Sequence, residues 1–433
     1  ASWNREVAAL AASTIAAEAK AEGVSVVLGP GVNMKRSPLC GRNFEYFSED
    51  PYFAGSFAAA YIGAMQARGV GSCIKHFAVN NQETRRFTVS ANVAARPLHE
   101  TYLRAFEITI TESRPDAVME AYNRINGRHA AESEWLLDGI LRKKWGYSGV
   151  VMSDWEAVNE RVDSLRAGLD LEMPTSHGNG KKMIVDAVTR GDLPEKILDR
   201  SARRVLELML RRKAEASPQR PDRAAQHENA LRCARECMVL LKNRGKTLPL
   251  RVGEPLAVIG GFAKAPRFQG GGSSHVEPTR VEDITTFLAE ENHAEICFAR
   301  GYDEKHETND ALLVEAVETA KRCGRAVIFA GLPEFSETEG RDRRHLRLPD
   351  AHNALIEAVA AVCPRTVVVL FGGSPAELPW VDKVSAILHA YLGGQALGGA
   401  VARILFGRVN PSGKLAETHP LRLEDTPTYG FFP

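Results

Sequence analysis

The first part of the chain alternates short apolar runs that end in polar residues with segments of helical periodicity. The apolar runs are VSVVLGPGVN (24–33), VGSCIKHF (70–77), DAVMEAYN (116–123), GVVMSDW (149–155) and AGLDLEMP (167–174). Helical patterns lie between several of them, at LHETYLRAFEITITES (98–113) and SEWLLDGILRKKW (133–145). This order predicts parallel β/α units of a TIM-type (β/α) barrel, whose strand ends gather polar side chains into one cleft.

After residue 175 the pattern changes to helix, with Ile197, Val205, Leu206 and Met209 at helical spacing. A polar, proline-bearing stretch at 214–226 reads as a linker, and ENALRCARECMVLLKN (228–243) reads as a connecting helix. A second set of β/α units follows, with strands expected within 255–263, 325–333, 365–373 and 386–394. Short buried runs of Val, Ile, Leu and Ala before glycine turns predict an open, mainly parallel sheet in an α/β/α sandwich.

The predicted organisation is therefore a barrel domain over residues 1–213, a linker and connecting helix over 214–245, a sandwich domain over 246–421 and a tail over 422–433. A chain of 433 residues is long enough for two such cores.

Composition narrows the classes of ligand. There are 55 Lys and Arg residues against 54 Asp and Glu, a formal net charge of +1, which does not favour nucleic acid or an anionic membrane surface as partner. Apolar runs are much shorter than the roughly 20 residues of a membrane helix. The first residues read as an amphipathic helix rather than a secretory signal, although a removed leader is left open.

Seven scattered cysteines form no CxxC pair and no Cys/His cluster at metal-binding spacing. They predict reduced, mostly buried thiols in a cytoplasmic protein. Neither a metal nor a cofactor is expected, and a homo-oligomer is left open.

Asp154 follows an apolar strand and stands beside Trp155, where barrel enzymes hold their chemistry. Lys75 and His76 end another strand, and Arg42 follows an earlier one. Cationic donors in a cleft with a carboxylate suit a polyhydroxylated ligand, because each sugar hydroxyl both donates and accepts. The plainer interpretations are a helix-capping Asp and an ordinary ion pair or core histidine.

The segment GLPEFSETEGRDRRHLRLP (331–349) is rich in carboxylates and arginines. Such a run is usually a solvated surface, but crowding can also make one carboxyl group a proton donor near neutral pH. The glycine-rich FQGGGSSH (268–275) lacks the lysine and spacing of a phosphate-binding P-loop, which argues against a nucleotide-binding protein.

Together these segments resemble glycoside hydrolase family 3, the retaining β-glucosidase family. The matching stretches include GPGVNMKRSPLCGRNFEYFSEDP, KHFAVNNQETRR, MEAYNRING, VVMSDWEAV, AGLDLEMP, QGGGSSHVEP, SETEGRDRRHLRLP and LFGRVNPSGKLAETHP, in family order from residue 29 to residue 420. The resemblance implies that Asp154 is the nucleophile and Glu339, in the loop of the sandwich domain, the general acid/base. It also implies six substrate-binding residues: Arg42, Lys75 and His76 on sugar hydroxyls, Tyr122 orienting the nucleophile, and Met119 and Trp155 lining the sugar pocket.

The implied function is an exo-acting β-glucosidase that needs no metal and releases the terminal non-reducing sugar with retention, from a small oligosaccharide or an aryl or alkyl glycoside. Retaining hydrolysis needs two carboxyl groups about 5 to 5.5 Å apart. Because Asp154 and Glu339 lie in different predicted domains, the active site is expected at their interface.

Several alternatives stay open on the same scaffold: a β-xylosidase, an α-arabinosidase, an exo-glucanase or a catalytically inactive sugar-binding protein. The TEGRDR loop argues against the family branch that acts on N-acetylglucosaminides. Family members usually carry an upstream segment with the first barrel strand, so the barrel is expected to lack that strand here. Many also continue into a fibronectin-like domain after the point that corresponds to TYGFFP, and whether such a domain was removed or never present is left open.

Overall fold

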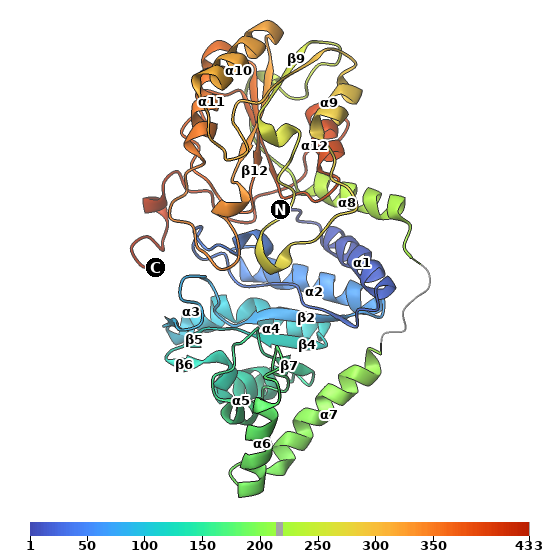
Figure 1. The fold of residues 1–433 in the computed structure, drawn as a ribbon, viewed down its shortest axis with the longest axis vertical. Helices are drawn as coiled ribbons and strands as arrows, with labels where there is room; N and C mark the ends of the chain where they lie inside the picture. Colours follow the sequence, from blue (N-terminus) through green and yellow to red (C-terminus); the bar gives the residue numbers. More distant parts are fainter. Residues whose placement is uncertain (214–219, 433) are drawn as a thin grey trace. The chain divides into compact units, whose positions relative to one another are not determined.

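The protein folds into two compact units, seen in a computed structural model that describes residues 1–213 and 220–432 (Figure 1). The N-terminal unit comprises residues 8–36 and 46–222, and the C-terminal unit comprises residues 1–7, 37–45 and 223–433. The predicted boundaries differ from these in three places. Residues 1–7 and 37–45 belong to the C-terminal unit, and so do residues 223–245, the greater part of the linker and connecting helix expected over 214–245. The first residues of that linker, 214–219, lie outside the described residues.

A parallel sheet of four strands, in the order β1-β2-β4-β7, forms the centre of the N-terminal unit. Its strands are β1 (Val26–Val27), β2 (Gly71–Phe77), β4 (Ala117–Glu120) and β7 (Val150–Met152). A second, small sheet contains β3 (Ser90–Ala91), β5 (Arg124–Ile125) and β6 (Arg128–His129). Strands β2, β4 and β7 are almost fully buried, as expected for a parallel sheet covered on both faces, whereas β1 is half-buried.

Helices alternate with these strands. They are α1 (Arg5–Ala21), α2 (Pro51–Ala67), α3 (Ala95–Pro97), α4 (Arg104–Ser113), α5 (Arg161–Ala167), α6 (Asn179–Arg190), α7 (Glu195–Arg211), the π-helical η2 (Leu98–Tyr102) and η4 (Trp135–Lys144), and the 3-10 turn η3 (Ala130–Glu132). Helix α2 starts at Pro51, because Asp50 accepts a hydrogen bond from the Phe53 N–H at 2.6 Å and Pro51 occupies the first turn.

The two faces of the sheet have separate cores. One face packs against α2, α4 and η4 through residues such as Ile62, Phe106 and Val151. The other face holds a smaller cluster in which Cys73, Met119 and Met152 meet Val205 and Leu208 of α7. The polar ends of the strands are thus carried by a sheet that is fixed from both sides.

The predicted strand at 167–174 is wrong. Residues 161–167 complete helix α5, and only Leu171 makes an isolated bridge, to Met152. Gly168 and Asp170 interrupt the apolar run, and the Asp170 carboxylate instead accepts a hydrogen bond from the Val151 N–H at 2.9 Å. The parallel β/α succession itself is confirmed.

The C-terminal unit contains a sheet of six strands in the order β10-β9-β11-β12-β13-β8. The strands are β8 (Val239–Asn243), β9 (Leu256–Ile259), β10 (Ile296–Ala299), β11 (Ala326–Gly331), β12 (Thr366–Phe371) and β13 (Ala386–Tyr391). All neighbouring pairs are parallel except β13 with β8. This is the predicted mainly parallel sheet.

Helices cover both faces of this sheet. Figure 1 shows α10 (Asp310–Cys323) and α11 (Asp350–Val362) on one side, and α9 (Ile284–Asn292) and α12 (Leu397–Leu405) on the other. Helix α8 (Arg223–Cys237) packs against α12. The remaining elements are the 3-10 turns η1 (Asn43–Glu45), η5 (Arg244–Lys246), η6 (Gly261–Ala263), η7 (Gly272–Ser274), η8 (Glu334–Ser336) and η9 (Leu423–Asp425).

One helix prediction is partly wrong in this unit. The segment 228–243 does not continue as a helix, because α8 ends at Cys237 and Val239–Asn243 form strand β8 along the edge of β13. Strand β10 was not predicted at all.

The prediction of unpaired, mostly buried cysteines is confirmed: all seven thiols are free, and five of them are buried. Among residues 1–213 and 220–432, no helix combines the length and apolar character needed to span a bilayer.

Candidate active site

Asp154 lies in the turn that follows strand β7, and only 6% of its surface is exposed. The strand end is anchored on both sides of the carboxylate: the Ser153 N–H donates to the Leu171 carbonyl at 2.9 Å, and the Ala157 N–H donates to the Asp154 carbonyl at 3.2 Å. The Trp155 N–H donates to Oδ1 of Asp154 at 2.8 Å. A backbone donor and a fixed strand end therefore hold this carboxylate in one orientation.

His76, on strand β2, faces the other oxygen of Asp154, with Nε2 at 3.7 Å from Oδ2. Its main chain is fixed by Asn33, whose Oδ1 accepts from the His76 N–H at 2.8 Å and whose Nδ2 donates to the His76 carbonyl at 2.9 Å. On the ring, Nδ1 lies 3.2 Å from the Tyr46 hydroxyl and 3.3 Å from Asn33 Oδ1.

The tautomer decides which partners the ring serves. With its hydrogen on Nε2, the ring accepts from the Tyr46 hydroxyl at Nδ1 and turns an N–H towards Oδ2 of Asp154. With its hydrogen on Nδ1, the ring donates to Asn33 Oδ1 instead.

Lys75 precedes His76 and is half-buried. Its backbone is held by the Pro30 carbonyl and the Val32 N–H, at 3.1 and 2.8 Å. Burial raises the pKa of the nearby Cys73 thiol, which the charge of Lys75 lowers and that of Asp154 raises further. Lys75 and Asp154 thus both lie within electrostatic reach of Cys73.

Met119, Tyr122 and Trp155 differ in exposure. Met119 is 2% exposed and belongs to the inner cluster with Cys73. Tyr122 is buried, and the Arg86 guanidinium lies 4.5 Å above its ring. Trp155 is 40% exposed, so its indole remains accessible to a ligand.

Glu120 is a buried acid next to this group that the sequence analysis did not single out. It ends strand β4, is fully buried, and neither carboxyl oxygen has a hydrogen-bond partner within the described residues. Burial, and then the charge of Asp154, raise its pKa well above the usual value, against the opposing effect of the Asp154 N–H. These surroundings favour the neutral form of Glu120.

Glu339 lies in the C-terminal unit, in the loop between β11 and α11. Its Oε2 accepts a hydrogen bond from the Ser273 N–H at 2.8 Å, and its Oε1 lies 3.6 Å from Nη1 of Arg42. Gly272 has φ +87°, and a Cβ there would lie 2.4 Å from the Glu339 Cβ. The glycine-rich segment 268–275 thus lets the chain approach this carboxylate closely.

Arg42 belongs to segment 37–45, which packs within the C-terminal unit. The Arg343 N–H donates to the Leu39 carbonyl at 2.8 Å, and the Gly41 N–H donates to Oδ1 of Asp342 at 3.0 Å. Arg42 itself is only 1% exposed. The structure therefore places this predicted sugar-binding cation against Glu339, a contact that the sequence did not indicate.

Glu337, two residues before Glu339, is fully buried and has a structural role. Its carboxylate accepts from Arg267, from the Gly373 N–H at 2.6 Å and from Ser374 Oγ at 2.7 Å. Burial alone would raise its pKa, but the charge of Arg267, together with Arg343 and these hydrogen bonds, holds the pKa below the usual value. The two acids of this loop thus differ: Glu337 is buried and its charge is stabilised, whereas Glu339 is more accessible.

No three His, Cys, Asp or Glu side chains in the described part of the chain form a group able to hold a metal ion. The chemistry described here is that of two carboxyl groups, one in each unit.

Both parts of the chain match one family. Residues 1–208 match the glycosyl hydrolase family 3 N-terminal domain, and residues 238–432 match the glycosyl hydrolase family 3 C-terminal domain. The chain belongs to glycosyl hydrolase family 3. The fold follows the same family, since the crystal structure of the family 3 β-glucosidase of Bifidobacterium adolescentis superposes with a TM-score of 0.95 at 44% identity, covering 99% of this chain and 63% of that one.

Curated family 3 relatives differ in the sugar that they are named for. The thermostable beta-glucosidase B of Acetivibrio thermocellus is 50% identical over 438 residues, across 100% of this chain. The exo-alpha-(1->6)-L-arabinopyranosidase of Bifidobacterium longum is 45% identical over 440 residues, across 99% of this chain. The chain spans 58% of the length of each of these two relatives.

The family 3 site residues predicted from sequence fall into two groups. Asp154 and Glu339 lie in the N-terminal and C-terminal units, respectively. Of the substrate-binding set, Lys75, His76, Met119, Tyr122 and Trp155 lie in the unit of Asp154, and Arg42 lies in that of Glu339. The sequence reasoning missed Asn33 and Tyr46, although both lie inside the quoted family motif, because their contacts with His76 join distant parts of the chain.

Proposed function

We propose that the protein is an exo-acting retaining β-glucosidase. The observation that supports this most strongly is the 50% identity of a beta-glucosidase across the whole chain. In addition, the carboxylates of Asp154 and Glu339 each accept a hydrogen bond from a backbone N–H. Two carboxyl groups of opposite protonation are what retaining hydrolysis requires.

In this proposal the Asp154 carboxylate attacks the anomeric carbon and forms a glycosyl-enzyme. The Trp155 N–H and His76 Nε2–H stabilise the ionised nucleophile. Glu339 protonates the leaving oxygen and then removes a proton from the water that releases the sugar. Lys75 and Arg42 donate to sugar hydroxyls, Tyr122 orients the nucleophile, and Met119 and Trp155 line the ring of the sugar.

The test uses Asp154→Asn and Glu339→Gln on 4-nitrophenyl β-D-glucoside. We expect kcat of each variant to fall at least about a hundredfold. A 2,4-dinitrophenyl leaving group needs little protonation, so glycosylation by Glu339→Gln should recover on that substrate while Asp154→Asn should not. Glu334→Gln, an exposed acid of the same loop, is the matched control and should retain activity. Activity of both active-site variants within tenfold of the wild type would refute the proposal.

An α-L-arabinopyranosidase is the second candidate, because two relatives at 44 to 45% identity carry that name. Arabinopyranose lacks the hydroxymethyl group of glucose, so the two activities differ in contacts to that group. The ratio of kcat/KM values for 4-nitrophenyl β-D-glucoside, β-D-xyloside and α-L-arabinopyranoside distinguishes them.

A further inference from the structure

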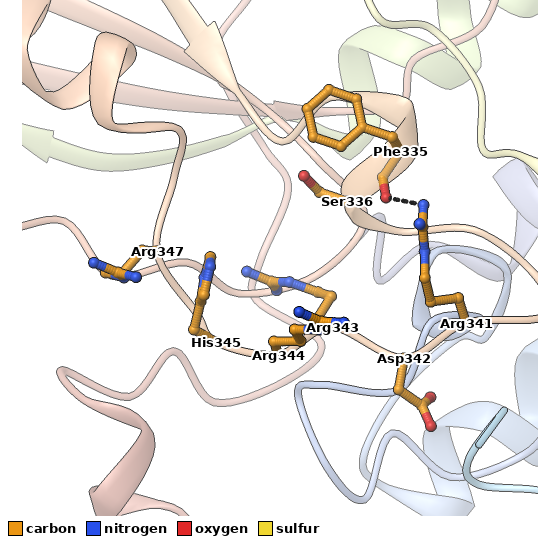
Figure 2. A pocket seen from close by; sticks show the side chains of 8 residues that line it. All are labelled: Phe335, Ser336, Arg341, Asp342, Arg343, Arg344, His345 and Arg347. Atoms are coloured by element: carbon orange, nitrogen blue, oxygen red, sulfur yellow. Dashed lines mark hydrogen bonds between the residues drawn. The ribbon is translucent and has the colours of Figure 1, made fainter.

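The loop that follows Glu339 forms a small basic pocket. The pocket has a volume of about 240 Å³ and is lined by Phe335, Ser336, Arg341, Asp342, Arg343, Arg344, His345 and Arg347. Figure 2 shows the side chains of Arg343, Arg344, His345 and Arg347 following one another along the loop, with Arg341 on the side of Phe335. Four arginines and a histidine thus face one cavity with a single carboxylate, and we call this cavity the arginine pocket.

Arg343 is the buried member of the arginine pocket, with 6% of its surface exposed. Its Nη1 donates to the Pro375 carbonyl at 2.6 Å, but its Nη2 is buried and has no hydrogen-bond partner within the described residues. Burial lowers the pKa of Arg343 to about 10, against the opposing charges of Glu337 and Glu417, so the group stays protonated at neutral pH. The chain supplies no acceptor for this Nη2, so it can donate to a group bound in the pocket.

The outer members are exposed. No hydrogen bond or ion pair joins the side chains of Arg344, His345 or Arg347 to another residue in the described parts of the chain. Arg341 donates to the Phe335 carbonyl, and the carboxylate of Asp342 accepts from the Gly41 N–H. An ordinary solvated charge run has neither a cavity nor a buried guanidinium, so the solvated-surface interpretation does not explain this loop.

We propose that the arginine pocket binds an oxyanion, a phosphate or carboxylate group. The planar fork of a guanidinium matches the two oxygens of either group, and a bound anion would relieve the repulsion among the clustered cations. The anion has two sources: a free anion in solution, or an acidic substituent of the leaving group of a glycoside. The second source rests on the proposed function, and it is suggested because only Gly340 separates Glu339 from Arg341.

The first experiment titrates the full-length protein with inorganic phosphate by calorimetry, at constant ionic strength. We expect saturable binding that the double variant Arg344→Gln/Arg347→Gln weakens at least about tenfold. Arg322→Gln/Arg408→Gln removes two exposed arginines of the same unit outside the pocket and should change the affinity less than twofold. Because both pairs lie on the surface, melting curves should show that all variants are folded.

Arg343→Lys tests the buried member, since lysine keeps the charge beside Glu337 but removes the fork. We expect it also to weaken phosphate binding at least about tenfold while rescuing the fold better than Arg343→Gln. Absence of saturable binding to the wild type, or equal weakening by the control pair, overturns the proposal.

The second experiment distinguishes the sources. It compares kcat/KM for 4-nitrophenyl and 4-carboxyphenyl β-D-glucosides in the wild type and in Arg344→Gln/Arg347→Gln. A selective loss on the carboxyphenyl glucoside supports an anion carried by the substrate, and an unchanged ratio with lost phosphate binding supports a free anion. If the protein hydrolyses neither glucoside, the proposed function fails, whereas the phosphate titration still decides the pocket.

Discussion

Glu337 and Glu120 are both fully buried carboxyl groups, yet their surroundings shift their pKa values in opposite directions. Arg267 and two further donors lower the pKa of Glu337, whereas burial and the charge of Asp154 raise that of Glu120 against the opposing Asp154 N–H. Burial alone disfavours the charged form of both, so the neighbours decide. A buried acid in this protein therefore cannot be assigned a charge from its burial.

The protonation of Glu120 predicts a pH dependence of stability. In the unfolded chain a glutamate ionises near pH 4.5, and in the folded protein its pKa is raised. The stability that the neutral form contributes is therefore complete below about pH 4.5 and is lost as the pH rises towards the folded pKa. Glu120→Gln cannot ionise, so between about pH 5 and the folded pKa of Glu120 its free energy of unfolding should gain on the wild type, by at most about 1.4 kcal/mol per pH unit.

Urea unfolding at pH 5, 6 and 7 measures this difference. Glu134→Gln, which removes an exposed carboxylate of the same unit, is the matched control. A difference between Glu120→Gln and the wild type that stays constant over this pH range would show that Glu120 is already ionised in the folded protein.

At the residue scale, the sequence identifies groups that belong to a motif and misses their distant neighbours. Asp154 and Glu339 stand in recognisable segments, and the structure places both in fixed loops. The contacts of Asn33 and Tyr46 with His76 depend on how separate strands come together, and nothing local in the sequence indicates them. The same holds for the contact of Arg42 with Glu339.

At the scale of elements, apolar runs predicted the buried strands well and failed where a run was ambiguous. The segments that became β2, β7, β11 and β12 are dense in β-branched or apolar residues and end at polar or glycine turns. The run MVLL at 238–241 reads equally as helix or strand, and pairing with the edge of β13 decides for β8. Leu169 and Leu171 do not form a full strand: Gly168, with φ +120°, caps helix α5 directly before them, and only Leu171 makes a bridge, to Met152.

Close packing between two segments leaves no room for a side chain at Gly41. A Cβ on Gly41 would lie 2.0 Å from the carbonyl oxygen of Arg341 and 2.5 Å from that of Thr338, which flank Glu339. Gly41→Ala must therefore shift backbone on one side of the contact. We expect a lower melting temperature and, because a displacement of about 1 Å can reduce catalysis a hundredfold, at least tenfold lower kcat/KM on an aryl β-glucoside.

Gly63→Ala is the matched comparison. Gly63 lies at an exposed position of α2, and a Cβ there would meet no atom within 4 Å. This variant should be more stable by about 0.5 to 1 kcal/mol and unchanged in activity. A wild-type melting temperature for Gly41→Ala would contradict the packing argument.

At the scale of the whole molecule, the chain does not divide cleanly at one point. Residues 1–7 and 37–45 come from the N-terminal half of the sequence but belong to the C-terminal unit. The Lys414 N–H donates to the Ala1 carbonyl at 2.9 Å, and Phe44 lies between Gly270 and Gly373, where a Cβ would approach it to 2.1 and 2.3 Å. The chain therefore passes from one unit to the other after residues 7, 36 and 45 as well as after residue 222. A boundary predicted from composition alone misses the first three of these crossings.

Splitting the chain tests this arrangement. Halves 1–213 and 220–433, expressed together with a tag on one of them, should purify as a complex, because the first half supplies parts of the second unit. The half 220–433 alone should aggregate or melt at least about 5 °C below the corresponding transition of the intact protein. Phe44→Ala in the first half should weaken the complex. A well-folded, monomeric 220–433 with an unchanged melting temperature would rule out this dependence.

The nine-residue excursion 37–45 also limits how this enzyme family can be recombined. In a chimaera that fuses the C-terminal half of this chain to the N-terminal half of a relative, segment 37–45 comes from the relative. The residues that replace Arg42 and Phe44 would then contact Glu339, Gly270 and Gly373. Exchanging the Glu339 loop between relatives would therefore require exchanging segment 37–45 together with it, as one graft taken from two distant places in the gene.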